Sequence, residues 1–336
     1  MKAEELEMTD VGASELASYM TTVIERLRGE GKFPAVHVYR CALHSFQKFA
    51  GGSDVQLSMD DVFTPGRLKA YEEWLMVKQK RELNTVSGYM RILRAIYNRW
   101  TPPGTLGHDS RLFSNVYTKV VSQTKRALNE KQMERLLKAD MYGLSDALTK
   151  DQQAVLAYFL LMFMFRGMPF IDLAHLRKCD IRGRYIIYRR HKTGKQLTVE
   201  IPPAALRLIR EYRDGNSDNA YLFPILDTDI HSSLEQYRRY RDALRRFNHA
   251  LKLIMKRLLP GIKISSYTAR HTWATIAYHL GQPIGLISQS LGHSSVRVTE
   301  TYFKPFENAR IDKLNRQLIE VVKKGKWKNR GTCNIL

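Results

Sequence analysis

The chain of 336 residues is long enough for two domains that each bury a core of their own. Lysine and arginine together number 54 against 33 aspartates and glutamates, and the formal charge of +21 predicts an anionic partner, with nucleic acid the leading candidate. Membrane-spanning and secreted proteins are not expected, because no apolar run reaches about 18 residues and the polar segment from Met1 to Thr9 is unlike a signal peptide.

Cysteine usage also argues against an extracellular or metal-binding protein. The three cysteines, Cys41, Cys179 and Cys333, are scattered and lack the C-x-x-C spacing of zinc sites and redox motifs. We therefore expect no disulfide framework, no metal site and no cofactor. Together with the positive charge, this predicts a cytoplasmic protein associated with the nucleoid.

The first hundred or so residues are predicted to be helical. Apolar residues recur there at three- and four-residue intervals, without a strand pattern, in the stretches 16–27, 38–49, 68–77 and 86–97. Basic and aromatic residues interleave with this apolar stripe, which predicts a helical surface that contacts DNA phosphates through Arg40, Lys48, Arg91 and Arg94. The alternative interpretation is a solvated face whose long side chains only cover apolar surface.

A break in the helical pattern marks the predicted domain boundary. Thr101-Pro102-Pro103-Gly104 stops the helix, and the chain then remains polar and weakly periodic for about twenty residues. The domain boundaries that we expect are a helical domain 1–110, a linker 111–126, a second domain 127–322 and a basic C-terminal tail 323–336.

The second region is also mainly helical, and one hairpin interrupts it. Tyr185 to Arg190 and Gln196 to Ile201 are short β-rich runs that flank the turn Lys192-Thr193-Gly194-Lys195. Helical spacing occupies the remaining stretches, namely the apolar run 154–165 and the segments 204–213, 234–259, 267–280, 284–291 and 311–323. The predicted fold class is therefore mainly α with a small β-hairpin or sheet.

Two short signatures follow each other near the end of this region. The segment from Ser266 to Thr275 contains Arg270-His271-Thr272, and the segment from Leu291 to Tyr302 begins with Leu291-Gly292-His293. In order and spacing they resemble the R-H-T-x-A-T and L-G-H-S-S-x-x-x-T-x-x-Y boxes of the tyrosine recombinase, or phage integrase, family. The resemblance implies a helical, SAM-like core-binding domain followed by a mixed α/β catalytic domain of the tyrosine recombinase type.

The residue types in these signatures suit the chemistry that the resemblance implies, which is DNA cleavage through a covalent 3′-phosphotyrosine. A five-coordinate phosphate carries extra negative charge, which the Arg270 guanidinium neutralises and His293 stabilises by donating a hydrogen bond. Tyr302 supplies the nucleophile, and its phosphate ester conserves the bond energy, so that a second DNA hydroxyl can reseal the strand. A structural histidine and a core tyrosine are the alternative interpretations of His293 and Tyr302.

The hairpin turn supplies a further catalytic candidate. The family places a lysine between two such strands as general acid toward the leaving 5′ oxygen, and Lys192 matches that position. Lys195, on the far side of the turn, is the less favoured candidate and is expected to contact DNA instead. An ordinary solvated turn has the same sequence pattern.

Two positions depart from the family pattern. Asp172-Leu173-Ala174-His175-Leu176-Arg177 resembles the segment in which the family's catalytic arginine stands three residues before the acid, but Pro169 occupies that position here. We expect Arg166, in F-R-G-M-P-F, to substitute for it, whereas a cation at the end of the preceding helix is the alternative. Tyr267 stands three residues before Arg270, where the family commonly has histidine or lysine, and its role stays open.

The resemblance also implies partners. Enzymes of this family clamp double-stranded DNA, bind an inverted-repeat core site as homodimers and pair two sites in a homotetramer, for DNA inversion, resolution or integration. The C-terminal helix pattern and basic tail would then pack on a neighbouring protomer or touch DNA. Three alternatives remain open: a site-specific DNA-binding protein of the same fold with impaired cleavage, a type IB topoisomerase-like enzyme, and a basic helical structural protein.

Overall fold

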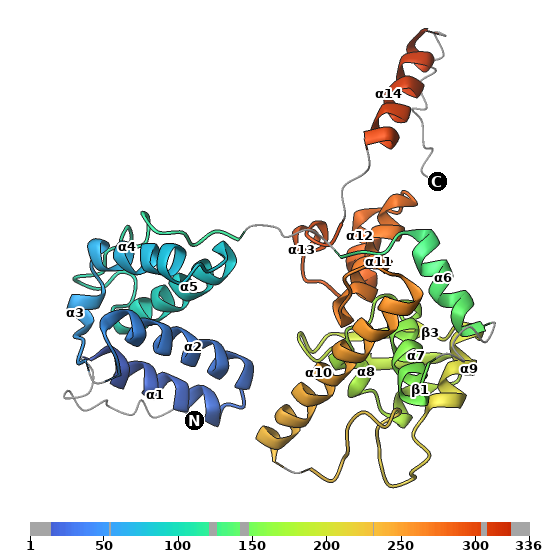
Figure 1. The fold of residues 1–336 in the computed structure, drawn as a ribbon, viewed down its shortest axis with the longest axis horizontal. Coiled ribbons are helices and arrows are strands. Elements are labelled where there is room, and N and C mark those ends of the chain that lie inside the picture. The colour runs from blue at the N-terminus through green and yellow to red at the C-terminus, as the bar shows by residue number, and fades with distance from the viewer. Residues whose placement is uncertain are drawn as a thin grey trace, which may run out of the picture. The chain divides into compact units, whose positions relative to one another are not determined.

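The chain forms two compact units, which Figure 1 shows as a ribbon. Unit 1 comprises Met1–Gln123 with Ser232–Tyr237, and unit 2 comprises Thr124–His231 with Arg238–Leu336. The computed structural model describes residues 15–53, 55–120, 126–141, 148–230, 232–303 and 308–323. Beyond Lys323, the predicted basic tail lies outside the described residues.

Unit 1 consists of helices whose apolar faces meet in one core. These helices are α1 (Leu16–Gly29), α2 (Phe33–Ala50), α3 (Met59–Val62), α4 (Pro65–Glu73) with a π-helical turn at Trp74–Lys78, and α5 (Leu83–Trp100). The four predicted helical stretches are confirmed, the third passing from α to π geometry at Trp74. α2 ends at Gly51, whose φ of 113° is a left-handed conformation that glycine adopts without steric cost.

The core of unit 1 extends into the segment predicted as a linker. Leu112, Phe113 and Val116 are buried in the same cluster as the helices. The backbone N–H of Tyr117 donates to the buried carboxylate of Glu72, which fastens this segment to α4. Residues 111 to about 117 therefore belong to unit 1, because three apolar side chains gain burial there.

Unit 2 combines helices with one small sheet. Its helices are α6 (Glu130–Met141), α7 (Lys150–Met164), α8 (Phe170–Ala174), a 3-10 turn at Lys178–Asp180, α9 (Pro203–Tyr212), α10 (Ser233–Leu258) from Arg238 onward, α11 (Ser266–His279), α12 (Ile284–Ser290), α13 (Val296–Glu300) and α14 (Asn308–Lys323). The helices predicted in this region are confirmed. The three shortest segments are α8, α13 and the 3-10 turn. They are too short for a helical period to be visible in the sequence.

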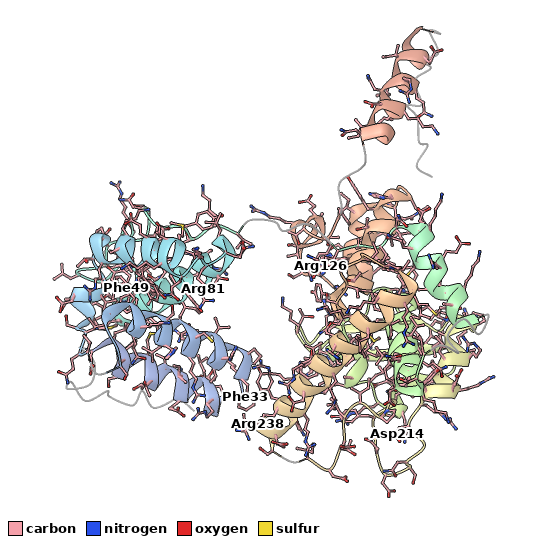
Figure 2. All side chains as sticks on the ribbon, in the orientation of Figure 1. Phe33, Phe49, Arg81, Arg126, Asp214 and Arg238 are labelled. Atoms are coloured by element: carbon pink, nitrogen blue, oxygen red, sulfur yellow. The ribbon has the colours of Figure 1, made fainter. Side chains whose placement is uncertain are left out.

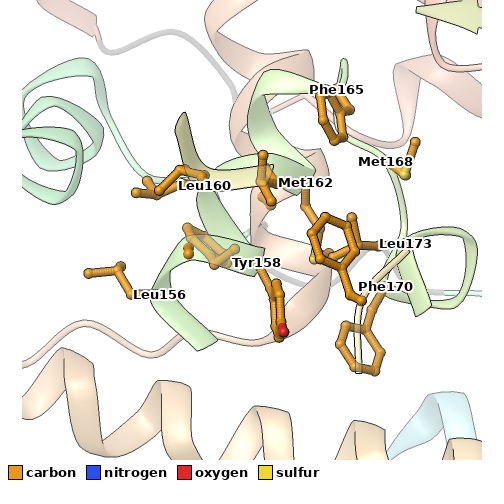
Figure 3. Packing of buried hydrophobic residues seen from close by; sticks show 14 of the residues in the cluster. Leu156, Tyr158, Leu160, Met162, Phe165, Met168, Phe170 and Leu173 are labelled. Atoms are coloured by element: carbon orange, nitrogen blue, oxygen red, sulfur yellow. The ribbon is translucent and has the colours of Figure 1, made fainter. Parts of the chain in front are cut away.

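α7 is the central helix of unit 2. Its residues from Leu156 to Met162 are all buried, and Figure 3 shows Leu160, Met162 and Phe165 within the packed cluster. A capping box between Thr149 and Gln152 fixes its first turn. Because this part of α7 has no polar face, its sequence is an unbroken apolar run, and the helix predicted there is confirmed. Among the described helices, none is both long and apolar enough to cross a bilayer.

The predicted hairpin is confirmed as β2 (Tyr185–Arg189) and β3 (Gln196–Glu200), with the two-residue strand β1 (Ile181–Arg182) added at the edge of β2. The antiparallel register pairs Ile186 with Val199, and both side chains are buried against the helices. The opposite face and the turn remain exposed. The sheet thus holds the turn and the residue that follows β2 at a fixed distance from α11 and α12.

Candidate active site

Four of the predicted site residues come together from consecutive segments of unit 2. α11 carries Tyr267 and Arg270 near its start, the turn after α12 carries His293, and Tyr302 follows α13. A capping box at Ser265 fixes where α11 begins. The two sequence signatures therefore fold into one site.

The Arg270 guanidinium is buried and held by backbone carbonyl groups. Arg270 is only 2% exposed. Its Nη1 donates to the Gly167 carbonyl oxygen at 2.9 Å, and its Nη2 to that of Leu291 at 2.6 Å. Burial, reinforced by the nearby charge of Arg190, lowers the pKa of Arg270. An arginine nevertheless stays charged in proteins, so the site contains a fixed positive charge below the surface.

A second buried guanidinium, which the sequence reasoning missed, belongs to Arg190. Arg190 directly follows β2 and is 5% exposed. Its Nη1 donates to the carbonyl oxygens of Leu291 and Gly292, both at 3.0 Å. Because Arg270 also donates to the Leu291 oxygen, the two guanidinium groups share one acceptor. Two like charges are thus brought together by the fold.

Asp172, the acid three residues after Pro169, lies beside Arg190. Its Oδ2 is 3.5 Å from Arg190 Nε, and its Oδ1 accepts the backbone N–H of His191 at 2.9 Å. Burial raises the pKa of Asp172, while the His191 N–H and the Arg190 charge oppose that rise. The carboxylate therefore faces Arg190.

Two glycines make room for the guanidinium groups. A Cβ on Gly167 would meet the Arg270 Cα at 3.0 Å, and a Cβ on Gly292 would meet the Arg190 Cδ at 2.9 Å. Both glycines have left-handed φ angles, of 68° and 66°. Any side chain at either position would push an arginine out of place. The glycine of F-R-G thus leaves space for Arg270, and the glycine of L-G-H leaves space for Arg190.

His293 is neutral. Its pKa is lowered to about 3, first by burial and then by the positive charges of Arg270, Arg190 and Lys192. Since a guanidinium cannot accept a hydrogen bond, Nε2 of His293 accepts from Arg270 Nη2 at 2.8 Å. The ring proton is therefore on Nδ1, which donates to Thr299 Oγ1 at 2.8 Å. For His293 to donate to a phosphate as expected, Nε2 must first gain a proton, which an arriving anion favours.

Tyr302 is packed among the other site residues. It is 9% exposed, and its ring centroid lies 4.8 Å from those of both His271 and His293. The guanidinium carbon of Arg270 lies 5.5 Å from the Tyr302 ring centroid. The hydroxyl oxygen of Tyr302 is 2.7 Å from that of Tyr267. The nucleophile candidate and the buried cations therefore lie in one site.

The two turn lysines lie at the solvent side of this site. Lys192 and Lys195 are both exposed in the β2–β3 turn. The Lys192 charge contributes to the lowered pKa of His293, so its ammonium lies within electrostatic range of the site. The Lys195 carbonyl oxygen accepts the Arg190 backbone N–H at 2.9 Å, which closes the turn above the buried guanidinium.

Arg166, the expected substitute for the arginine missing at Pro169, contacts the sheet. It follows the end of α7 with a φ of 58°, and its Nη1 donates to the Thr198 carbonyl oxygen of β3 at 3.3 Å. Its side chain is half-buried, and the contact fastens the end of α7 to the sheet. The position opposite Arg270 is occupied by Arg190.

The predicted DNA-contacting residues of the first domain lie on two helices of unit 1. Arg40 and Lys48 are exposed on α2, and Arg91 and Arg94 are exposed on one face of α5. Figure 2 shows the side chains around each unit. Within the described residues, none of these four cations forms an ion pair, and each stays available to a phosphate.

No metal site is found among the residues that the structure describes. No three His, Cys, Asp or Glu side chains gather there as metal ligands would. The described cysteines, Cys41 and Cys179, are free thiols.

Comparison with known families gives two matches. Residues 126–308 match the phage integrase family, and residues 15–99 match the phage integrase SAM-like domain. The chain is 28% identical over 207 residues to the tyrosine recombinase XerA of Thermococcus kodakarensis, covering 60% of this chain and 66% of that protein. It is 20% identical over 258 residues to a tyrosine recombinase of Thermosipho africanus, covering 74% and 83%. The alignment thus spans slightly less than two thirds of the XerA relative.

Solved structures show the same fold. A XerH site-specific recombinase bound to a palindromic difH substrate matches with a TM-score of 0.61 and 17% identity, covering 89% of this chain and 83% of that one. The Tn1549 transposon integrase in complex with transposon right end DNA matches with a TM-score of 0.61 and 14% identity, covering 91% and 99%. The predicted fold class is confirmed.

The protonation state of His293 is directly measurable. In DNA-free protein labelled with [15N]histidine, we expect the neutral Nδ1–H tautomer from about pH 8 to about pH 5, because the folded pKa lies well below the ordinary value near 6.5. His293→Gln assigns the signal, and Thr299→Val, which removes the acceptor, should shift the Nδ1 resonance. An imidazolium near pH 6, or an Nε2–H tautomer, would contradict the geometry.

Proposed function

Because the chain belongs to the phage integrase family of tyrosine recombinases, we propose that it is a site-specific DNA recombinase that cleaves and rejoins strands through a 3′-phosphotyrosine on Tyr302. The observation that carries the proposal is the meeting of Arg190 and Arg270 on the Leu291 carbonyl oxygen, in the pocket that also holds Tyr302. It acts on DNA in the cytoplasm, at the nucleoid, in keeping with its charge of +21.

The buried cations suit a phosphodiester. Asp172 pairs with Arg190, and Arg270 adds a second positive charge, so these three groups together keep an excess of positive charge. A five-coordinate phosphate places extra negative charge on its non-bridging oxygens. Guanidinium donors in fixed positions therefore stabilise this transition state more than they stabilise the ground state. We therefore assign one non-bridging oxygen to Arg190 and the other to Arg270. His293 supports the same oxygens once it is protonated.

The reaction exchanges one phosphate ester for another. The Tyr302 oxygen bonds to phosphorus while the bond from phosphorus to the 5′ oxygen breaks. The phenol proton passes to solvent, and Lys192 donates a proton to the leaving 5′ oxygen from the exposed turn. Attack by a 5′ hydroxyl of another strand reverses these steps. The strand is then joined to a new partner, which is the recombination step.

Unit 1 serves as the core-binding domain and unit 2 as the catalytic domain. The match of residues 15–99 to the SAM-like domain supports the first assignment, and the match of 126–308 supports the second. Arg40, Lys48, Arg91 and Arg94 contact the phosphates of the core site, and Lys195 does so from the turn of unit 2. Such contacts position the protein and are weakened by salt.

The chain assembles on an inverted-repeat core site as a dimer, and two sites pair in a tetramer. α14 supports this, because one of its faces exposes Ile311, Leu314, Leu318 and Ile319, each at least 44% exposed. An exposed apolar face on an amphipathic helix requires a partner, here a neighbouring protomer. Two related structures are described as a lambda integrase dimer on a core site and a tetramer on a Holliday junction.

Covalent capture tests the proposed activity. We expect the wild-type chain to form denaturant-resistant adducts with members of a library of nicked suicide duplexes, and sequencing of the captured DNA to give the core site. Tyr302→Phe should form none, because it lacks the nucleophile but keeps the ring packing. An absence of adducts across the whole library would contradict the proposal. Relaxation of plasmids that lack the captured sequence would identify a topoisomerase instead.

The two candidate arginines can be separated in the same assay. Arg190→Ala should slow cleavage by roughly 100- to 1000-fold, the usual cost of losing one donor to the developing charge, whereas Arg166→Ala should stay within about 10-fold. A neutral methylphosphonate at the scissile position removes the charge that Arg190 stabilises, so it should restore most of the Arg190→Ala rate. A large loss confined to Arg166→Ala would show that the displaced arginine is Arg166.

Native mass spectrometry tests the assembly. On a duplex that carries the captured core site we expect two copies of the chain per DNA, and Leu314→Asp together with Leu318→Asp should leave one copy bound, because charges on that face cannot be buried. A wild-type complex that never exceeds one copy would refute the dimer.

A further inference from the structure

Tyr267 contacts the nucleophile itself. Its hydroxyl oxygen lies 2.7 Å from that of Tyr302, within the range of a strong hydrogen bond between hydroxyl groups. The two rings are tilted by 34° with centroids 5.9 Å apart, so the contact is made at the hydroxyl ends. Tyr267 is also one of the two positions at which the sequence departs from the family pattern.

Tyr267 shares one face of α11 with two other residues whose polar atoms contact Tyr302. His271 Nδ1 lies 3.3 Å from the Tyr302 carbonyl oxygen, and Thr275 Oγ1 donates to the same oxygen at 3.5 Å. Residues 267, 271 and 275 are spaced by four, so they lie on one face of the helix. One helix face thus holds both the main chain and the hydroxyl of the nucleophile. Arg270 lies on the adjacent face of the same helix.

We propose that Tyr267 is a positioning residue for the nucleophile: its hydroxyl donates a hydrogen bond to the Tyr302 oxygen, directs it toward the phosphate held by Arg190 and Arg270, and stabilises its ionised form. This inference rests on the proposed strand-cleavage function. Tyr267 itself forms no bond to the DNA.

The direction of the hydrogen bond follows from the surroundings of the two hydroxyls. Burial, together with the neighbouring Tyr302 hydroxyl, raises the pKa of Tyr267 to about 12. Tyr267 therefore keeps its proton when Tyr302 loses one, and it cannot act as a base near neutral pH. An ordinary phenol ionises only near pH 10, so a neighbouring donor increases the fraction of reactive phenolate at neutral pH.

The test uses the captured core-site duplex and single-turnover cleavage. Tyr267→Phe removes one hydroxyl from a residue that is 41% exposed, so the fold is expected to persist, and thermal melting and DNA affinity check this. At about pH 7 the cleavage rate should fall by roughly 10- to 100-fold, as for the loss of a hydrogen bond to a charged oxygen. The deficit should shrink as the pH rises, because a higher pH favours the phenolate that the hydrogen bond otherwise stabilises.

Two modified substrates separate this role from the others. A 5′-bridging phosphorothiolate has a leaving group that needs no proton, so it should relieve a Lys192→Ala defect but not that of Tyr267→Phe. A methylphosphonate should relieve Arg190→Ala but not Tyr267→Phe. Tyr278→Phe, on the same helix, is the matched control: it keeps its ring stacking on Phe303 at 4.2 Å and should cleave at the wild-type rate.

Several outcomes would overturn the inference. A wild-type rate for Tyr267→Phe would show that the hydroxyl contributes nothing. If the methylphosphonate relieved the Tyr267→Phe defect, the Tyr267 hydroxyl would act on the phosphate. If the phosphorothiolate relieved it, the hydroxyl would be the acid for the leaving group. A deficit that is constant with pH would mean that the hydroxyl contributes only to packing. In each case the wild-type chain still forms its adduct, so the recombinase function survives. Failure of the wild-type adduct would instead remove the function on which the inference rests.

Discussion

The carbonyl oxygen of Leu291 is the point on which the site depends. Arg190, at the end of β2, and Arg270, on α11, both donate to it. Like charges repel in the interior, so this meeting must be imposed by the surrounding structure. The buried sheet residues hold β2, and α7 packs against α11. Gly167 and Gly292 leave the space through which the two side chains pass.

Part of this pocket is left unsatisfied by the protein itself. Within the described part of the chain, the Nε atoms of Arg190 and Arg270 and the Asp172 Oδ2 are buried without a hydrogen-bond partner. Arg190 and Asp172 form an ion pair at 3.5 Å without a hydrogen bond between the two atoms. Such groups cost folding free energy, and an anion that accepts from the guanidinium groups would recover part of it. The buried guanidinium donors are thus in place before an anion binds.

The sequence predicted the parts of the site that local spacing defines. Arg270, His293 and Tyr302 were found because their signatures have fixed spacing, and the hairpin because two short β-rich runs flank a turn that contains Gly194. Arg190 was missed because it is one of 54 basic residues, and its burial depends on Gly292, far along the chain. The sequence feature that could have pointed to Arg190 is Asp172, because a buried acid needs a cation beside it. Leu112, Phe113 and Val116 were likewise an apolar signal inside an otherwise polar segment.

The role of Tyr267 depends on what lies opposite it, and no local pattern gives that. Its partner stands 35 residues later in the chain, and α11 brings the two hydroxyls together. A crystal structure of the chain on its core-site DNA, with vanadate replacing the scissile phosphate, measures the whole arrangement. We expect vanadium bonded to the Tyr302 oxygen, with its equatorial oxygens within hydrogen-bond distance of the Arg190 and Arg270 guanidinium groups. Vanadate bound away from both arginines, with the Tyr302 hydroxyl directed elsewhere in every protomer, would contradict the account.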